Sequence, residues 1–185
     1  LALARAIQES MLPALPLGVP GIGVATSIDM AGEVCGDLFD CFTLPDEPNA
    51  MYCLIGDVCG KGIPASVIMS RAMALARSFL LSGATLADTL FRLNEALLRS
   101  NDSLMFVTLL VARLDGKTGQ FTWASAGHPP PMPGPTATGE SQPASGLLPW
   151  SAELVLGVKH GCVYTEHSMQ LARGLWDLNT RQVPG

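Results

Sequence analysis

The chain has 185 residues, of which 48% are hydrophobic and 15% are charged, and it carries a net charge of −5 at pH 7. This length allows one domain with a hydrophobic core. The acidic balance argues against a nucleic-acid-binding protein, which normally presents a basic patch, and it is compatible with an enzyme that gathers acidic side chains around a cation.

The best candidate for a membrane-spanning segment is interrupted by Arg71 and Arg77, and a spanning helix needs roughly 20 apolar residues. We therefore expect a soluble, cytoplasmic protein without direct membrane insertion. The cysteines are odd in number and include no C-x-x-C pair, so reduced, mostly buried thiols are expected instead of a disulfide framework or a zinc ribbon. They are Cys35, Cys41, Cys53, Cys59 and Cys162.

Residues 1–13 predict a linker-like helix with Leu3, Ile7 and Met11 on one face. This segment is either a linker that follows an upstream module or an amphipathic helix that packs on its own domain. We assign residues 14–185 to one domain. Because the chain begins without a methionine, we expect it to be a piece of a longer protein.

Acidic side chains lie near the ends of two neighbouring predicted strands. Asp37 and Asp40 belong to a strand at 33–44, and Asp57 ends the strand at 50–57. Paired strands can bring Asp37 or Asp40 within reach of Asp57. The alternative is that these residues are surface acids at a turn. A further strand is predicted at residues 22–30, before these two strands. A Pro/Asp turn is predicted between the two strands, at residues 45–49.

Asp57 lies in a glycine-rich stretch, Leu54–Ala65, where an apolar strand ends and a helix begins. This density of glycine indicates that a phosphate or a metal approaches the main chain. A Walker A loop is excluded, because three residues instead of four separate Gly56 from Gly60, and a glycine follows Lys61. Asp57 is then either a ligand of a hard divalent cation or a cap of the following helix or turn.

Two helices and a β-hairpin follow. The helices are predicted at 63–81 and, behind a Thr85 cap, at 85–99. The hairpin has strands at 106–114 and 120–126 around an Asp-Gly turn. Together with the earlier strands, these elements predict one α+β unit built on antiparallel sheet.

The last third of the chain predicts less regular structure. A Pro/Gly-rich loop is expected at about 129–149, as a flexible insert or a disordered span. Two short strands are expected at 154–158 and 162–169.

Three polar residues are candidates either for contact with a substrate or for structural roles: Lys61, Asn94 and His128. The imidazole of His128 titrates near neutrality, so it suits a general acid or a phosphate-facing group, or else it hydrogen-bonds the turn.

Six blocks match family motifs in the same order. They are Ile7-Gln8 with Met11-Leu12-Pro13, Glu33–Asp40, Ile55–Ala65, Leu93-Asn94, Phe106-Val107-Thr108 and Ala126–Pro130, against I-Q-x-x-L-L-P, E-V-G-G-D-F-Y-D, G-D-V-S-G-K-G-x-x-A, L-N, F-V-T and A-G-H-P-P. On these blocks the chain resembles the metal-dependent protein phosphatases, specifically the bacterial branch typified by the stage II sporulation E phosphatase.

The resemblance implies two antiparallel β-sheets packed face to face and flanked by helices, with a pair of Mn²⁺ or Mg²⁺ ions at one edge. Asp57 would bridge the ions, the Val58 carbonyl would be a further ligand, and Asp37 and Asp40 would bind a metal directly or through water. The ions would activate a water that attacks the phosphoryl group in line, without a protein nucleophile.

The resemblance also implies a partner. The expected substrate is a phosphoserine or phosphothreonine on a regulatory protein of sigma-factor control, of the anti-sigma antagonist type. An upstream sensor module would act through the helices after Gly62. A homodimer is compatible with the resemblance.

The sequence departs from the family near its end. Leu175–Thr180 stands where the family has a T-D-G-V-T-E block, and Asp177 is the only nearby carboxylate. Cys35 stands where the family has glycine. We therefore expect a domain incomplete at its C-terminus that binds two ions, one or none. The alternative function is a catalytically silent, phosphatase-like domain that binds a regulator without hydrolysis.

Overall fold

The computed structural model describes Ser10, Pro13 and residues 18–26, 36–99, 105–136, 153–171 and 174–177. Two helices and seven strands lie in these ranges, in the order β1 (Leu38–Leu44), β2 (Glu47–Val58), α2 (Gly62–Leu81), α3 (Leu86–Leu98), β3 (Val107–Asp115), β4 (Gln120–Ala126), β5 (Met132–Thr136), β6 (His167–Gln170) and β7 (Gly174–Asp177).

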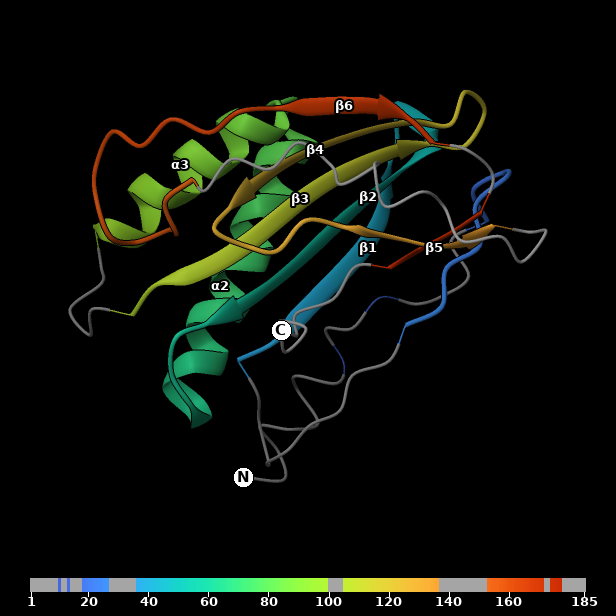
Figure 1. Cartoon of the computed structure of the whole chain (residues 1–185). Helices are drawn as coiled ribbons and strands as arrows, with labels where there is room; N and C mark the ends of the chain where they lie inside the picture. The colour runs from blue at the N-terminus through green and yellow to red at the C-terminus, as the bar shows by residue number, and fades with distance from the viewer. Residues whose placement is uncertain are drawn as a thin grey trace.

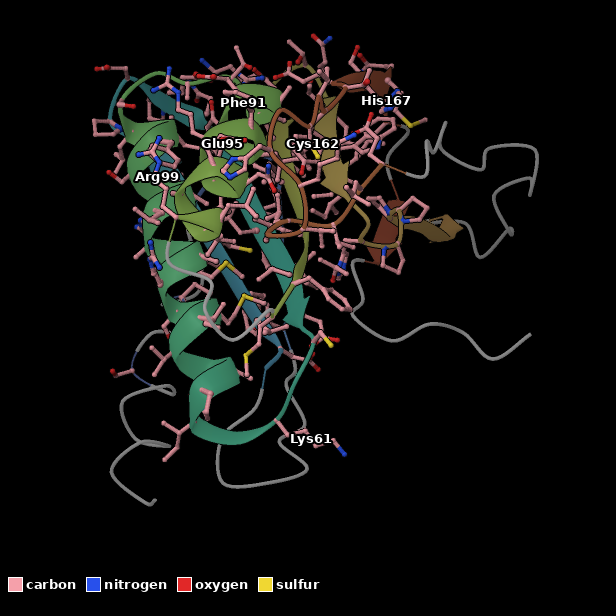
Figure 2. The ribbon with its side chains drawn as sticks, turned by 90° about the vertical axis from the view of Figure 1, so that its left-hand side faces the viewer. Lys61, Phe91, Glu95, Arg99, Cys162 and His167 are labelled. Atoms are coloured by element: carbon pink, nitrogen blue, oxygen red, sulfur yellow. The ribbon has the colours of Figure 1, made fainter. Side chains whose placement is uncertain are left out.

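The main sheet has five antiparallel strands in the order β1-β2-β3-β4-β6. Helices α2 and α3 cover one face of it (Figure 1). Strands β5 and β7 pair as a separate two-stranded sheet, and Figure 2 shows this small sheet on the side away from the helices. The expected α+β fold with antiparallel sheets is confirmed.

Strand β2 is buried on both faces, which explains its long apolar run. Successive side chains of a strand point to opposite faces, so Leu54 joins the cluster under the helices whereas Ile55 joins the cluster on the other face. We call these the helix-side face and the far face. The far-face cluster contains Val19, Cys41, Met51, Cys53, Ile55, Leu110, Ala112, Phe121 and Trp123.

Helix α2 is long and apolar enough by composition to cross a membrane, yet it packs on the sheet as a core helix. Its buried residues, which include Met69, Ala76 and Leu80, belong to the helix-side cluster. The guanidinium of Arg77 forms an ion pair with Asp40 on β1 at 2.9 Å. Burial of this face accounts for part of the apolar character of α2, whereas Ile63, Val67 and Leu81 are exposed.

Local signals predict α3 and the β3–β4 hairpin correctly. The Thr85 hydroxyl accepts a hydrogen bond from the Asp88 N–H at 3.2 Å and caps α3. In the hairpin turn, Asp115 Oδ1 accepts bonds from the N–H groups of Lys117 and Thr118, at 3.0 and 2.9 Å. At the start of α3 and in the hairpin turn, a side-chain oxygen therefore accepts hydrogen bonds from backbone N–H groups.

The first part of the chain differs from the prediction. Residues 22–26 form no strand, although Ile22 and Val24 pack against the far-face cluster. The alternation of apolar residues in this segment therefore reflects packing on the core and not pairing with another strand. Residues 27–35 and the predicted N-terminal helix lie outside the described residues, apart from Ser10, which is helical, and Pro13, which is not. Strand β2 begins at Glu47, inside the predicted turn.

The last part also differs. Strand β5 lies inside the predicted loop 129–149, of which residues 137–149 lie outside the described part of the chain. Its prolines are compatible with a two-stranded sheet, because each strand there has an edge that needs no donor. Of the predicted strand 154–158, Leu156 alone forms a bridge, to Val107. Strand β6 covers only the end of the predicted strand 162–169.

Two adjacent leucines of α2 test its packing on the sheet. Leu80 is 1% exposed and Leu81 is 55% exposed. We expect Leu80→Ala to lower the free energy of unfolding by about 2 to 5 kcal/mol, because it opens a cavity in the helix-side cluster. Leu81→Ala, the matched control, should change it by less than about 0.5 kcal/mol. Denaturant unfolding measures both, and equal losses would contradict this packing.

Candidate metal centre

Asp57 lies at the end of β2, with its side chain exposed on the far face. The pairing of β1 with β2 ends at Leu38 opposite Gly56, so the next residue outward on each strand is Asp37 and Asp57. On the other side of β2, Thr108 of β3 is the direct partner of Asp57. Three adjacent strands therefore bring polar residues together at one edge.

The carboxyl groups of Asp37 and Asp57 interact directly. Partial burial raises the pKa of Asp57 to about 6, and the charge of Asp37 and a hydrogen bond to it act in the same direction. A hydrogen bond from the Val58 backbone N–H lowers the pKa of Asp57. Two acids held this close repel each other when both are ionised, and a cation between them would offset that repulsion.

Gly36 shapes the same corner. A Cβ atom at this position would lie 3.1 Å from the Val58 carbonyl oxygen and 3.3 Å from Asp57 Oδ1. The backbone of Gly36 therefore lies close over these two oxygens, and a side chain there would crowd them. The glycine before Asp37 thus leaves space beside a carbonyl and a carboxylate.

The oxygens of Asp37, Asp57 and the Val58 carbonyl suit a hard divalent cation, which takes carboxylate and carbonyl ligands. The residues present therefore fit Mn²⁺ or Mg²⁺. Within the described ranges no group of three His, Cys, Asp or Glu side chains is placed to hold a metal. Further ligands would have to come from water or from residues outside those ranges.

The structure does not bring Asp40 to this corner. Asp40 pairs with Leu54, a helix-side residue, and its carboxylate binds Arg77 at 2.9 Å. Asp37 and Asp40 are three residues apart on an extended chain, so they face opposite sides of the sheet. Grouping Asp40 with Asp57 is therefore corrected, and Asp40 ties β1 to α2.

The helix-cap interpretation of Asp57 is also corrected. The N-cap residue of α2 is Lys61, which makes no side-chain capping bond. Gly62 follows with φ of 73°, a conformation that favours glycine, and this turn separates Asp57 from the helix. Figure 2 shows the Lys61 side chain extending away from the ribbon at this loop.

His128 is buried behind Thr108. Its Nδ1 lies 3.1 Å from the Thr108 hydroxyl, which also donates a 3.4 Å hydrogen bond to the Asp57 carbonyl. The Ser125 hydroxyl donates to the His128 carbonyl and accepts from the His128 N–H. His128 therefore supports the strand ends beside Asp57. Thr108 and Ser125 were not predicted as site residues, although Thr108 belongs to the F-V-T block.

Asn94 lies on the helix side and is fully buried. Its amide nitrogen donates to the Lys159 carbonyl at 2.8 Å, and its Oδ1 accepts from the Gly157 N–H at 2.9 Å. The neighbouring Glu95 pairs with His160 at 2.7 Å. These contacts hold the segment around residue 158 on α3, which is a structural position.

The remaining residues are only partly placed. The backbone of Asp177 pairs with Met132 in the small sheet, and its side chain lies outside the described part of the structure. Cys35 also lies outside the described residues.

Asp57→Asn tests the acid pair through the pH dependence of stability without metal. The pKa of Asp57 is raised from its ordinary 3.8 to about 6, so the folded state binds this proton more tightly. Its contribution to stability is complete below the ordinary value and is lost as the pH rises through about 6. Wild type should therefore lose stability relative to Asp57→Asn between pH 4 and pH 7.

Denaturant unfolding with a chelator present measures this difference. Asp46→Asn, at an exposed turn residue, is the control and should track wild type. A constant difference between wild type and Asp57→Asn over this range would contradict the contact between the two acids.

A family model described as stage II sporulation protein E (SpoIIE) matches residues 47–175. Phosphoserine phosphatase RsbU of Bacillus subtilis is 27% identical over 173 residues, which cover 93% of this chain and 49% of RsbU. Protein IcfG of Synechocystis is 30% identical over 155 residues, 68% of this chain and 24% of IcfG. The chain thus spans half or less of these relatives.

Solved structures show the same fold. The RsbU and RsbW domains of Rv1364c from Mycobacterium tuberculosis match with a TM-score of 0.59 and 26% identity, over 78% of this chain and 38% of that one. The SiaA-PP2C domain of Pseudomonas aeruginosa matches with a TM-score of 0.64 and 18% identity, over 95% of this chain and 67% of that one. Since the family model covers most of the chain, this protein belongs to the stage II sporulation protein E family.

Proposed function

We propose that this chain is a metal-dependent serine/threonine protein phosphatase domain that hydrolyses a phosphoserine or phosphothreonine on a regulatory partner. The observation that carries the proposal is the corner formed by Asp37, Asp57 and the Val58 carbonyl, where two carboxylates share one space. The relative RsbU, which bears the name phosphoserine phosphatase, supports the reaction class.

Asp37, Asp57 and the Val58 carbonyl would hold the divalent metal. Bound Mn²⁺ or Mg²⁺ would activate water and neutralise the phosphoryl oxygens. Asp37 and Asp57 orient their oxygens from adjacent strands, and Thr108 with His128 fixes the strand end behind Asp57. A structure of RsbX in complex with magnesium, 20% identical with a TM-score of 0.57, supports the fold and the choice of ion.

The names of the relatives support a regulatory protein as the partner. We place the substrate among phosphorylated regulators of sigma-factor control, of the anti-sigma antagonist type, in the cytoplasm. An upstream sensor module and a homodimer are part of the same proposal. Lys61, exposed on the loop after β2, is the candidate for a contact with the phosphorylated partner.

A second candidate function is a catalytically silent domain that binds a phosphoprotein. The observation that favours it is the small donor set, because the described residues offer two carboxylates and one carbonyl at the corner and no third acidic side chain there. The two candidates differ in whether phosphate is released.

The test is Mn²⁺-dependent release of phosphate from a phosphoserine protein or an aryl phosphate. We expect Asp57→Ala to lose at least about 100-fold in rate, because a bound metal ion contributes several kcal/mol to charge stabilisation. Asp46→Ala, at an exposed turn residue, removes the same group elsewhere and should keep wild-type activity. Equal rates in wild type and Asp57→Ala would contradict the proposed phosphatase activity. Binding of a phosphoprotein without release of phosphate would support the catalytically silent domain.

A further inference from the structure

Cys41 and Cys53 face each other on the far face of the sheet. They are direct partners across β1 and β2, and their sulfur atoms are 3.2 Å apart, in hydrogen-bond contact. The residues are 7% and 5% exposed, and they belong to the far-face cluster. Neither thiol has a role in the proposed hydrolysis.

A short approach of the two sulfurs would allow a disulfide to form. A disulfide needs a sulfur separation of about 2.05 Å and Cβ atoms about 3.5 to 4.5 Å apart, and directly opposite residues of an antiparallel pair have Cβ atoms about 4.5 to 5.5 Å apart. The two sulfurs would therefore approach by roughly 1 Å while the ladder between β1 and β2 stays in register. Side-chain rotation and a small strand shift suffice for this.

The other described thiols differ. Cys59 is exposed, and Cys162 donates its S–H to the Lys159 carbonyl at 3.2 Å. An exposed thiol meets large and small oxidants alike, whereas the burial of Cys41 and Cys53 favours a small oxidant. The pair also differs in having a resolving thiol already in contact, so that a first oxidation can be completed within the protein.

We propose that Cys41 and Cys53 are a dithiol modification site that hydrogen peroxide converts reversibly to an intramolecular disulfide. In the first step one thiolate attacks peroxide, its sulfur becomes a sulfenic acid, and the O–O bond breaks with release of water after protonation. In the second step the other sulfur displaces the hydroxyl group as a second water, and the S–S bond forms. The two thiols lose two electrons and two protons, and one peroxide becomes two waters.

The bridge would join the two strands that carry the candidate metal ligands. Cys41 is four residues from Asp37, and Cys53 is four residues from Asp57, on the same face in each strand. Because the bond closes a short loop across an existing strand pair, it limits the unfolded chain more than it alters the folded one. The oxidised protein should therefore keep its fold and melt at a higher temperature, by roughly 5 °C.

The experiment treats the folded chain with excess hydrogen peroxide, blocks the remaining thiols after denaturation and digests on the amino side of aspartate. This digestion places Cys35, Cys41, Cys53 and Cys59 on four different fragments. We expect fragments 40–45 and 46–56 to be recovered as one species that is about 2 Da lighter than their sum. A dithiol reductant should separate them again.

Cys53→Ser and Cys59→Ser are the matched pair of variants. Cys59→Ser should form the bridge as wild type does, and Cys53→Ser should leave fragment 40–45 unbridged. Oxidised glutathione, which is much larger than peroxide, should react more slowly with the buried pair. The proposal is overturned if wild type keeps Cys41 and Cys53 alkylatable while Cys59 is oxidised, or if the bridge joins another pair. The bridge is detected in the wild-type protein, so the outcome does not depend on whether a variant folds. It also does not depend on phosphatase activity.

Discussion

The antiparallel pairing of β1 with β2 is the constraint on which the candidate site depends. Its register places Leu38 opposite Gly56, so Asp37 and Asp57 come next to each other at the open end of the ladder. A slip of one residue would turn one strand's side chains to the other face. Strand β2 is buried on both faces, as Leu54 and Ile55 show. Packing in the hydrophobic core therefore fixes the register of β1 and β2, and this register places the two acids next to each other.

Close backbone contacts keep this strand end in place. A Cβ atom at Gly56 would lie 2.5 Å from the Thr108 carbonyl oxygen, and one at Gly36 would crowd Asp57 and the Val58 carbonyl. The fold thus holds two carboxylates together beside the Val58 carbonyl, which is unfavourable when both acids are ionised and no cation is bound. Acidic groups with perturbed pKa values at the end of a rigid element are typical of functional sites.

Much of this arrangement could be predicted from local pattern. Apolar period, the Thr85 cap and the Asp-Gly turn identify α2, α3 and the β3–β4 hairpin, because each signal acts within a few residues. The two-residue strand period separates Asp37 from Asp40, but only the long-range register shows which one meets Asp57. Strand β5 was missed because its prolines suggest a loop and its partner β7 comes much later in the chain.

The most direct test of the account is Mn²⁺ binding, measured by calorimetry on wild type and three Asp→Asn variants. Asp37→Asn and Asp57→Asn should each weaken binding at least about 10-fold, since each removes a charged ligand. Asp40→Asn is the matched control, because that carboxylate binds Arg77 on the helix side, and it should bind Mn²⁺ as wild type does. Equal binding by all four proteins, or a loss confined to Asp40→Asn, would contradict a metal centre built on the β1–β2 register.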